Sequence, residues 1–275
     1  MGYVLIMWGF IMNDVTLIIQ GPMGKKLSDG LAKGIRNLET YCKFGKVIIS
    51  TWKSHGLKPS KKFLSSHNIT IIESDPYHYK HMYSNANMNY HVVSTLNGLK
   101  KVDTKYVIKI RSDEYYSDLS KFIEKIKSNP EKIITNNFFF SQDDSEPFHP
   151  SDHVVGGTTE NLLSMFKYAF KVCQKELGSI ALCSDYFDIP KWRNRDGNRK
   201  VSPEVFLCLC YLLSRGVKLE LSKSKEIMKK YYDVVPVTDM GKFLCKYMLT
   251  AVDSHAYKQL AQKRPKNFIN SMEEL

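Results

Sequence analysis

Hydrophobic and polar positions alternate along the first half of the chain in two kinds of run. Short, nearly continuous or alternating apolar runs are typical of buried strands, and apolar residues three or four positions apart are typical of helices. Runs of the first kind predict strands at residues 14–20, 46–52, 68–76, 106–111 and 132–140. Runs of the second kind predict helices at residues 27–41, 87–101, 119–129, 160–175 and 203–215.

Strands separated by helices of this length predict an α/β fold with a doubly wound, mostly parallel sheet. No internal repeat, low-complexity tract or linker interrupts the chain, so we expect a single domain over residues 12–275. Residues 1–11 are apolar but too few to span a bilayer, and they lack the basic flank and cleavage site of a signal peptide. We predict that they form an N-terminal extension.

Charge and cysteine usage narrow the class of protein. Lys and Arg number 40 against 28 Asp and Glu, which gives a formal charge of +12. The basic residues are scattered and form no stripe, so we expect no nucleic-acid partner, although a basic nucleic-acid-binding protein stays an alternative on charge alone. None of the six cysteines forms a CxxC pair, which argues against a zinc ribbon and favours a reduced, cytoplasmic protein that can contact a membrane surface.

Polar residues follow four of the predicted strands. In a doubly wound sheet, ligands bind beyond the carboxyl ends of the strands. Those ends read Gln20-Gly21-Pro22, Ser50-Thr51-Trp52, Ser74-Asp75-Pro76 and Arg111-Ser112-Asp113-Glu114. The sequence therefore predicts a ligand site at this edge of the sheet.

The fourth strand end carries the strongest chemical signal. If the strand geometry persists, Lys109, Arg111 and Asp113 lie on one face, with Asp113 at a solvent-facing strand end. Two cations and a carboxylate suit a diphosphate with a divalent metal ion, because a hard cation prefers oxygen ligands. The alternative is a turn that forms ion pairs within itself and caps the next helix.

Several of these segments resemble a known family. The run NANMNYHVVSTLNGLKKVDTKYVIKIRSDE resembles the centre of a GT-A glycosyltransferase, in which a strand ends in an Asp-x-Asp metal motif. Together with IIQGP, IISTW, SDP, SDHVVGG and PEVFL, it resembles the WavE-type glycosyltransferases of lipopolysaccharide synthesis. The resemblance implies a GT-A fold, with a nucleotide-binding half over residues 12–140 and an acceptor half over residues 141–275.

The resemblance also implies roles for individual residues. It places ten residues near the donor: Gln20, Gly21, Ser50, Thr51, Asp75, Asn87, Asn89, Lys109, Arg111 and Ser112. Asp113 matches the metal-binding carboxylate of Asp-x-Asp, and His153 is a candidate for a late metal ligand. Arg111 stands where the first carboxylate is expected, which puts the need for Mn²⁺ or Mg²⁺ in doubt, because a guanidinium can itself hold phosphate.

For some of these positions a structural role is as plausible as a functional one. Gly21 can serve a strand-ending turn, Asp75 an Asx-Pro turn, and the two asparagines a helix cap. Glu114 is expected to be a spare ligand at best. The segment FHPSDHVVGG, residues 148–157, is predicted to be a loop in which Gly156 and Gly157 let a sugar approach the backbone.

Two carboxylates are candidates for the general base. Glu204 is predicted in the first turn of a helix, after Ser202 as N-cap and Pro203 at the first helical position. The resemblance places Glu204 where inverting enzymes keep their base; Asp152 is the nearest rival, and Asp185 another.

The resemblance implies transfer of a sugar from a nucleotide sugar, with a UDP-sugar favoured, to a glycan or glycolipid acceptor, with inversion. A nucleotidyltransferase acting on sugar phosphates is an alternative within the enzymes.

Overall fold

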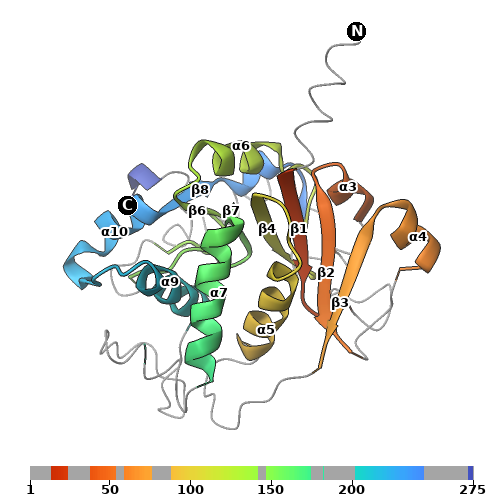
Figure 1. Ribbon diagram of the computed structural model, residues 1–275. Coiled ribbons are helices and arrows are strands. Elements are labelled where there is room, and N and C mark those ends of the chain that lie inside the picture. Colours follow the sequence, from red (N-terminus) through yellow and green to blue (C-terminus); the bar gives the residue numbers. More distant parts are fainter. Residues whose placement is uncertain are drawn as a thin grey trace, which may run out of the picture.

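The computed structural model describes residues 14–23, 38–53, 59–75, 88–141, 147–174, 182, 202–244 and 272–274. Its central feature is a seven-stranded sheet within these residues (Figure 1). The strands of this sheet are β1 (Val15–Gln20), β2 (Lys46–Trp52), β3 (Ile69–Ser74), β4 (Tyr106–Arg111), β6 (Ile133–Asn136), β7 (Val154–Thr158) and β8 (Tyr232–Val235). Two short strands, β5 (Tyr115–Tyr116) and β9 (Phe243–Leu244), form a separate antiparallel pair.

The strand order of the large sheet is β3-β2-β1-β4-β7-β6-β8. Strands β1 to β4 are parallel to one another, and β8 is parallel to β6. Strand β7 runs antiparallel to both β4 and β6. The predicted α/β architecture, with a mostly parallel sheet as in the GT-A fold, is confirmed.

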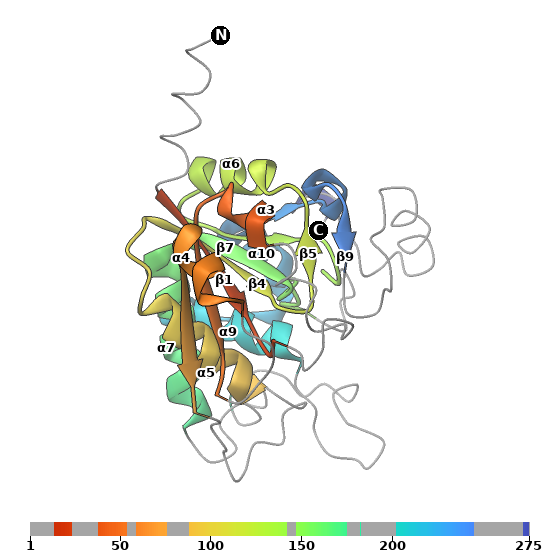
Figure 2. The same cartoon turned by 90° about the vertical axis from the view of Figure 1, so that its right-hand side faces the viewer.

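Helices cover both faces of the sheet (Figures 1 and 2). The helices are α3 (Leu38–Cys42), α4 (Lys61–Ser66), α5 (Met88–Leu99), α6 (Ser120–Ser128), α7 (Thr159–Cys173), α9 (Pro203–Ser214) and α10 (Ser224–Tyr231), with short 3-10 turns at Leu221–Lys223, Val237–Met240 and Met272–Glu274.

Alternating strand residues build the two cores. On one face, Ile18, Val107 and Val155 pack with α5, α7 and α9. On the other face, Leu17, Ile108 and Val154 pack with α3 and α6. Because side chains of a strand point alternately to opposite faces, nearly continuous apolar strands are required for this three-layer arrangement.

The predicted loop at residues 148–157 is wrong in its second half, because Val154 begins strand β7. Gly156 and Gly157 are buried in that strand. A Cβ at Gly156 would lie 2.5 Å from Ile126 Cδ1 and 2.7 Å from Phe122 Cε1. These glycines therefore allow helices to pack closely on the sheet, and the expectation that they admit a sugar is not met.

We expect Gly156→Val to lower the stability of the protein by about 1–3 kcal/mol, because the added methyl groups overpack the contact between β7 and α6. Urea unfolding followed by circular dichroism measures this change. An unchanged unfolding midpoint would show that α6 does not pack over Gly156 in solution.

Other boundaries differ from expectation. The strand predicted at residues 132–140 ends at Asn136, and Phe139 adopts a positive φ of 62°. The helix predicted at residues 27–41 is described only from Leu38, and the extension at residues 1–11 lies outside the described residues.

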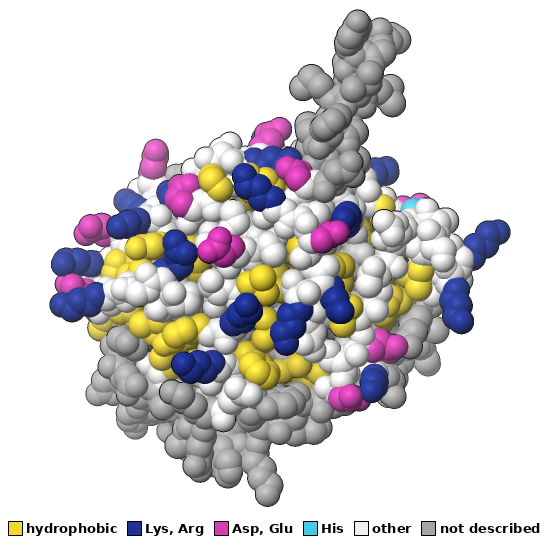
Figure 3. Space-filling view, viewed as in Figure 1, with side chains coloured by type: hydrophobic (Ala, Val, Ile, Leu, Met, Phe, Trp, Pro, Cys, Tyr) yellow, Lys and Arg dark blue, Asp and Glu magenta, His cyan; other side chains and the backbone are white. Residues whose placement is uncertain are grey.

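The surface agrees with a scattered distribution of charge. On the face shown in Figure 3, Lys and Arg side chains are spread among acidic and apolar ones and do not gather into a stripe. Within the described part of the chain, no helix combines the length and apolar character needed to cross a bilayer.

Candidate functional site

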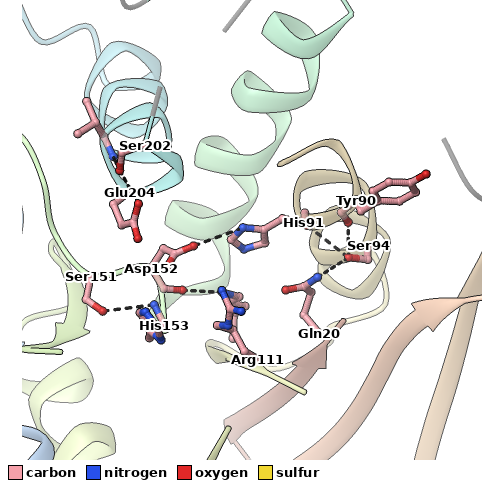
Figure 4. Close-up of polar contacts among 12 residues, drawn as sticks. Gln20, Tyr90, His91, Ser94, Arg111, Ser151, Asp152, His153, Ser202 and Glu204 are labelled. Atoms are coloured by element: carbon pink, nitrogen blue, oxygen red, sulfur yellow. Dashed lines mark hydrogen bonds and ion pairs between the residues drawn. The ribbon is translucent and has the colours of Figure 1, made fainter. Parts of the chain in front are cut away.

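The candidate site lies where strands end and begin at one edge of the sheet. Gln20 at the end of β1 pairs with Arg111 at the end of β4. Strand β7 runs in the opposite direction, and Val154 at its start pairs with Ile110. The residues just before Val154 therefore lie beside those just after Ile110, and the amino end of α9 faces the same place (Figure 4).

Arg111 holds the carboxylate of Asp113. Its Nε and Nη2 donate to the two oxygens of Asp113 at 2.9 Å each, and Nε lies 3.5 Å from Glu114 Oε1. Burial alone would lower the pKa of Arg111, but its bond to Asp113 and the charge of Glu114 outweigh burial and raise it. Asp113 is only 5% exposed, so its expected position at a solvent-facing strand end is wrong.

Glu114 is part of a closed ring of hydrogen bonds, and it has no exposed surface. Tyr116 Oη donates to Glu114 Oε2 at 2.9 Å, and Asn136 Nδ2 donates to Tyr116 Oη at 3.1 Å. Ser151 Oγ donates to Asn136 Oδ1 at 2.7 Å, and the backbone N–H of His153 donates to Ser151 Oγ at 3.3 Å. His153 Nδ1 contacts Glu114 Oε1 and closes the ring.

The ring fixes the orientation of His153 and raises its pKa. Burial alone would lower the pKa of His153, but the charge of Glu114 and the hydrogen bond between the two side chains outweigh burial and raise it. Since Nδ1 is held by Glu114, only Nε2 can take a further partner. The imidazole is thus locked by residues from three different segments of the chain.

Asp152 is the most constrained carboxylate of the site. It is 4% exposed, its Oδ1 has no hydrogen-bond partner, and its Oδ2 lies 3.6 Å from His91 Nδ1. Its backbone oxygen accepts from Lys109 Nζ at 2.6 Å. Burial would raise the pKa of Asp152, but the charges of Lys109 and His153 outweigh it and hold this pKa well below its usual range.

Two basic groups beside Asp152 are weakened as bases. Lys109 is completely buried, and mainly this burial lowers its pKa to about 8. Burial and the charge of Lys109 lower the pKa of His91 well below its usual value, which keeps this imidazole neutral near pH 7. Lys109 therefore supports the backbone of Asp152.

Glu204 approaches Asp152 from the amino end of α9. Ser202 is the N-cap and accepts from the Val205 N–H, and a proline occupies the first turn, as the sequence predicts. Ser202 Oγ also donates to Glu204 Oε2, which lies 4.0 Å from His149 Nε2. The side chain of Glu204 is 17% exposed, so it is more open to solvent than Asp152.

Three of these residues could hold a metal ion. Among the described residues, Asp152, His153 and Glu204 each offer one ligand atom, and these atoms lie within 4.8 Å of one another. Figure 4 shows Asp152 between Glu204 and His91, close to His153. Asp113 is not a member of this group.

The predicted donor residues near β1 form contacts within the fold. Gln20 Nε2 donates to Ser94 Oγ at 2.9 Å, and Ser50 Oγ donates to the backbone oxygen of Ser94 at 2.6 Å. Gly21 has a φ of +127°, and a Cβ there would lie 2.7 Å from Ser112 Oγ. The close approach of β1 and β4 beyond their last pairs therefore requires glycine at this position.

The other predicted donor residues are spread more widely. Thr51 Oγ1 and Asn89 Oδ1 are buried without a hydrogen-bond partner. Asp75 lies at the exposed end of β3 and forms an ion pair with Lys53 at 2.8 Å. Asn87 and Asp185 lie outside the described residues.

Sequence reasoning missed two members of the site. Glu114 was expected to be a spare ligand, but it is a member of the buried ring of hydrogen bonds, between Tyr116 and His153. His91 lies in the apolar stretch of α5, and a single polar residue in a helical pattern carries no signal of a site.

A model of the family described as WavE lipopolysaccharide synthesis matches residues 15–229 of the chain. A search of curated proteins finds no match. Solved structures with a similar fold include the glycosyltransferase GlyE of Streptococcus pneumoniae TIGR4, with 10% identity, a TM-score of 0.41, and coverage of 82% of this chain and 45% of GlyE.

Two further similar structures are S. aureus TarS and a putative glucose-1-phosphate thymidylyltransferase of Bacillus anthracis. TarS has 11% identity and a TM-score of 0.38, and the match covers 80% of this chain and 43% of TarS. The thymidylyltransferase has 13% identity and a TM-score of 0.37, with coverage of 76% and 97%. The chain thus spans less than half the length of GlyE and TarS, and likenesses this distant do not bear on its activity.

Proposed function

Because the chain belongs to the WavE lipopolysaccharide synthesis family, we propose that it is a glycosyltransferase that moves a sugar from a nucleotide-sugar donor to a glycan or glycolipid acceptor. The observation that carries this proposal is the convergence of Arg111, Asp152, His153 and Glu204 at the ligand-binding edge of the sheet. Such a site supplies both a cation for a leaving diphosphate and a carboxylate for an acceptor hydroxyl.

Glu204 is the general base in this proposal. It is the more exposed of the two neighbouring carboxylates, and an acceptor must reach the base from solvent. Asp152 is buried and has a strongly lowered pKa, so it is a weaker base and serves to shape the site. A single base on the acceptor side suits inversion at the anomeric carbon.

The proposed Mn²⁺ or Mg²⁺ requires ligand atoms that are open to it. Both oxygens of Asp113 accept from Arg111, so a metal ion at the position equivalent to Asp-x-Asp would compete with the guanidinium for this carboxylate. Asp152, His153 and Glu204 do fit a divalent cation by residue type and spacing. When bound, such an ion would neutralise charge on the diphosphate.

A thermal-shift screen tests the proposed donor. We expect one of the UDP-, GDP-, CMP- or dTDP-sugars, with a UDP-sugar favoured, to raise the melting temperature, because a ligand present at about 100 times its Kd stabilises the native state by about 2.7 kcal/mol. Arg111→Met should remove this shift. Transfer is then measured as nucleoside diphosphate released in the presence of a lipopolysaccharide extract.

Other outcomes of the same screen identify the alternatives. Stabilisation by a nucleoside triphosphate with a sugar 1-phosphate, and release of pyrophosphate, would indicate a nucleotidyltransferase. Stabilisation by RNA or DNA that falls steeply with salt would indicate a nucleic-acid-binding protein. Sedimentation with anionic vesicles measures the proposed contact with a membrane surface.

A further inference from the structure

Arg111 changes which carboxylates at the edge of the sheet are available to a metal ion. A bidentate pair of guanidinium and carboxylate uses both oxygens of Asp113 at 2.9 Å each. If Asp113 bound a metal ion instead, this pair would break. The charge of Arg111 would then be unpaired and would lie beside the charge of the metal ion. The carboxylate that follows β4 is therefore committed to Arg111.

Asp152 differs from Asp113, because its carboxylate is buried and one of its oxygens, Oδ1, has no hydrogen-bond partner among the described residues. Its side chain is 5% exposed, and Oδ2 lies 3.6 Å from Nδ1 of His91. Lys109 bonds to the backbone oxygen of Asp152. A buried polar atom without a partner is costly, and it indicates a ligand or ion that completes the site.

His153 is presented to Asp152 in the way that metal-ligating histidines usually are. Such histidines donate one ring N–H to a carboxylate, which fixes the tautomer and leaves the other nitrogen for the metal. Glu114 contacts His153 Nδ1, and Tyr116 and Asn136 hold Glu114 in turn. The buried ring thus fixes Nε2 as the open nitrogen.

We propose that a divalent cation, Mn²⁺ or Mg²⁺, binds between Asp152 Oδ1 and His153 Nε2, that Glu114 positions His153 for it, and that Asp113 is not a ligand. The ligand atoms of Asp152, His153 and Glu204 lie within 4.8 Å of one another. Opposite ligands of a Mg²⁺ ion are about 4.2 Å apart, so residues spaced in this way can share one ion.

Two protein ligands are sufficient for such a site. Mg²⁺ is usually held by one or two carboxylates together with substrate phosphates and water. Glu204, which is the more exposed member of the group, then remains next to the ion as the base. The inference deepens the proposed function, since it places the ion where the donor diphosphate would leave.

Electron paramagnetic resonance of Mn²⁺ with the intact protein, measured without donor, tests the proposal. We expect one bound Mn²⁺ per chain in the wild type. Asp152→Asn, which removes the negative charge of the proposed ligand, and His153→Asn, which removes Nε2, should weaken binding by at least about 10-fold, and Glu114→Gln by about 10- to 100-fold. Asp113→Asn should retain the ion, and the exposed control Asp103→Asn should keep the affinity within about 2-fold of the wild type, because neither change alters a proposed ligand.

The same measurement can overturn the proposal. It is wrong if Asp113→Asn abolishes Mn²⁺ binding while Asp152→Asn retains it. Wild-type protein that binds no Mn²⁺, with or without UDP, also contradicts it. Circular dichroism confirms the folding of each variant, and either ligand variant alone suffices if the other does not fold. If the wild type binds no Mn²⁺ but a nucleotide sugar stabilises it in EDTA, this inference fails and the proposed function stands.

Discussion

Glu204→Gln is expected to lower turnover by about 10²–10⁴-fold, while the affinity for the donor changes little. Glutamine keeps the shape of the side chain and can still accept from Ser202 Oγ, but it cannot take a proton from an acceptor hydroxyl. Steady-state transfer rates measure the loss, and the melting temperature with donor measures the affinity. The loss should appear in kcat at saturating acceptor.

Glu160→Gln is the matched control. Glu160 also lies in the first turn of a helix and is exposed, but α7 begins directly after the carboxyl end of β7, at the edge of the sheet opposite the site. Both carboxylates stabilise a helix terminus, an effect of about 0.3–1 kcal/mol. Equal turnover in the two variants would reduce Glu204 to this structural role and move the search for the base to Asp152.

The sequence predicts the sheet well because buried parallel strands are nearly continuous apolar runs. It also predicts the polar ends of β1 and β4, since parallel strands bring their carboxyl ends to one edge. Strand β7 was missed, because its two glycines are typical of a loop; the packing of Phe122 and Ile126 explains Gly156, and that of Leu162 explains Gly157.

The sequence predicts several individual residues of the candidate site, but it does not predict the contacts between them. Asp152, His153 and Glu204 were each candidates, yet only the antiparallel insertion of β7 beside β4 brings the first two next to Arg111. Glu114 was undervalued because its partners, Tyr116 and His153, are joined to it by tertiary contacts. Periodicity reports which face a residue occupies, and it carries no information on which buried polar groups meet.

Arg111→Met is expected to lower the stability of the protein by about 3–5 kcal/mol at pH 7, because it leaves buried carboxylates without their cation. The side chain of Asp113 is 7% exposed and that of Glu114 has no exposed surface. Urea unfolding of the wild type and the variant measures this loss.

Lys46→Met is the matched control for this experiment. Lys46 also binds a carboxylate through two short hydrogen bonds, to Asp103, but the two side chains are 40% and 68% exposed. Water replaces a lost partner at an exposed site, so the stability should hardly change. If Arg111→Met costs no more than this control, Asp113 and Glu114 are not held as buried anions in solution. Asp113, the carboxylate that follows β4, would then be able to bind a metal ion and would again be the candidate ligand.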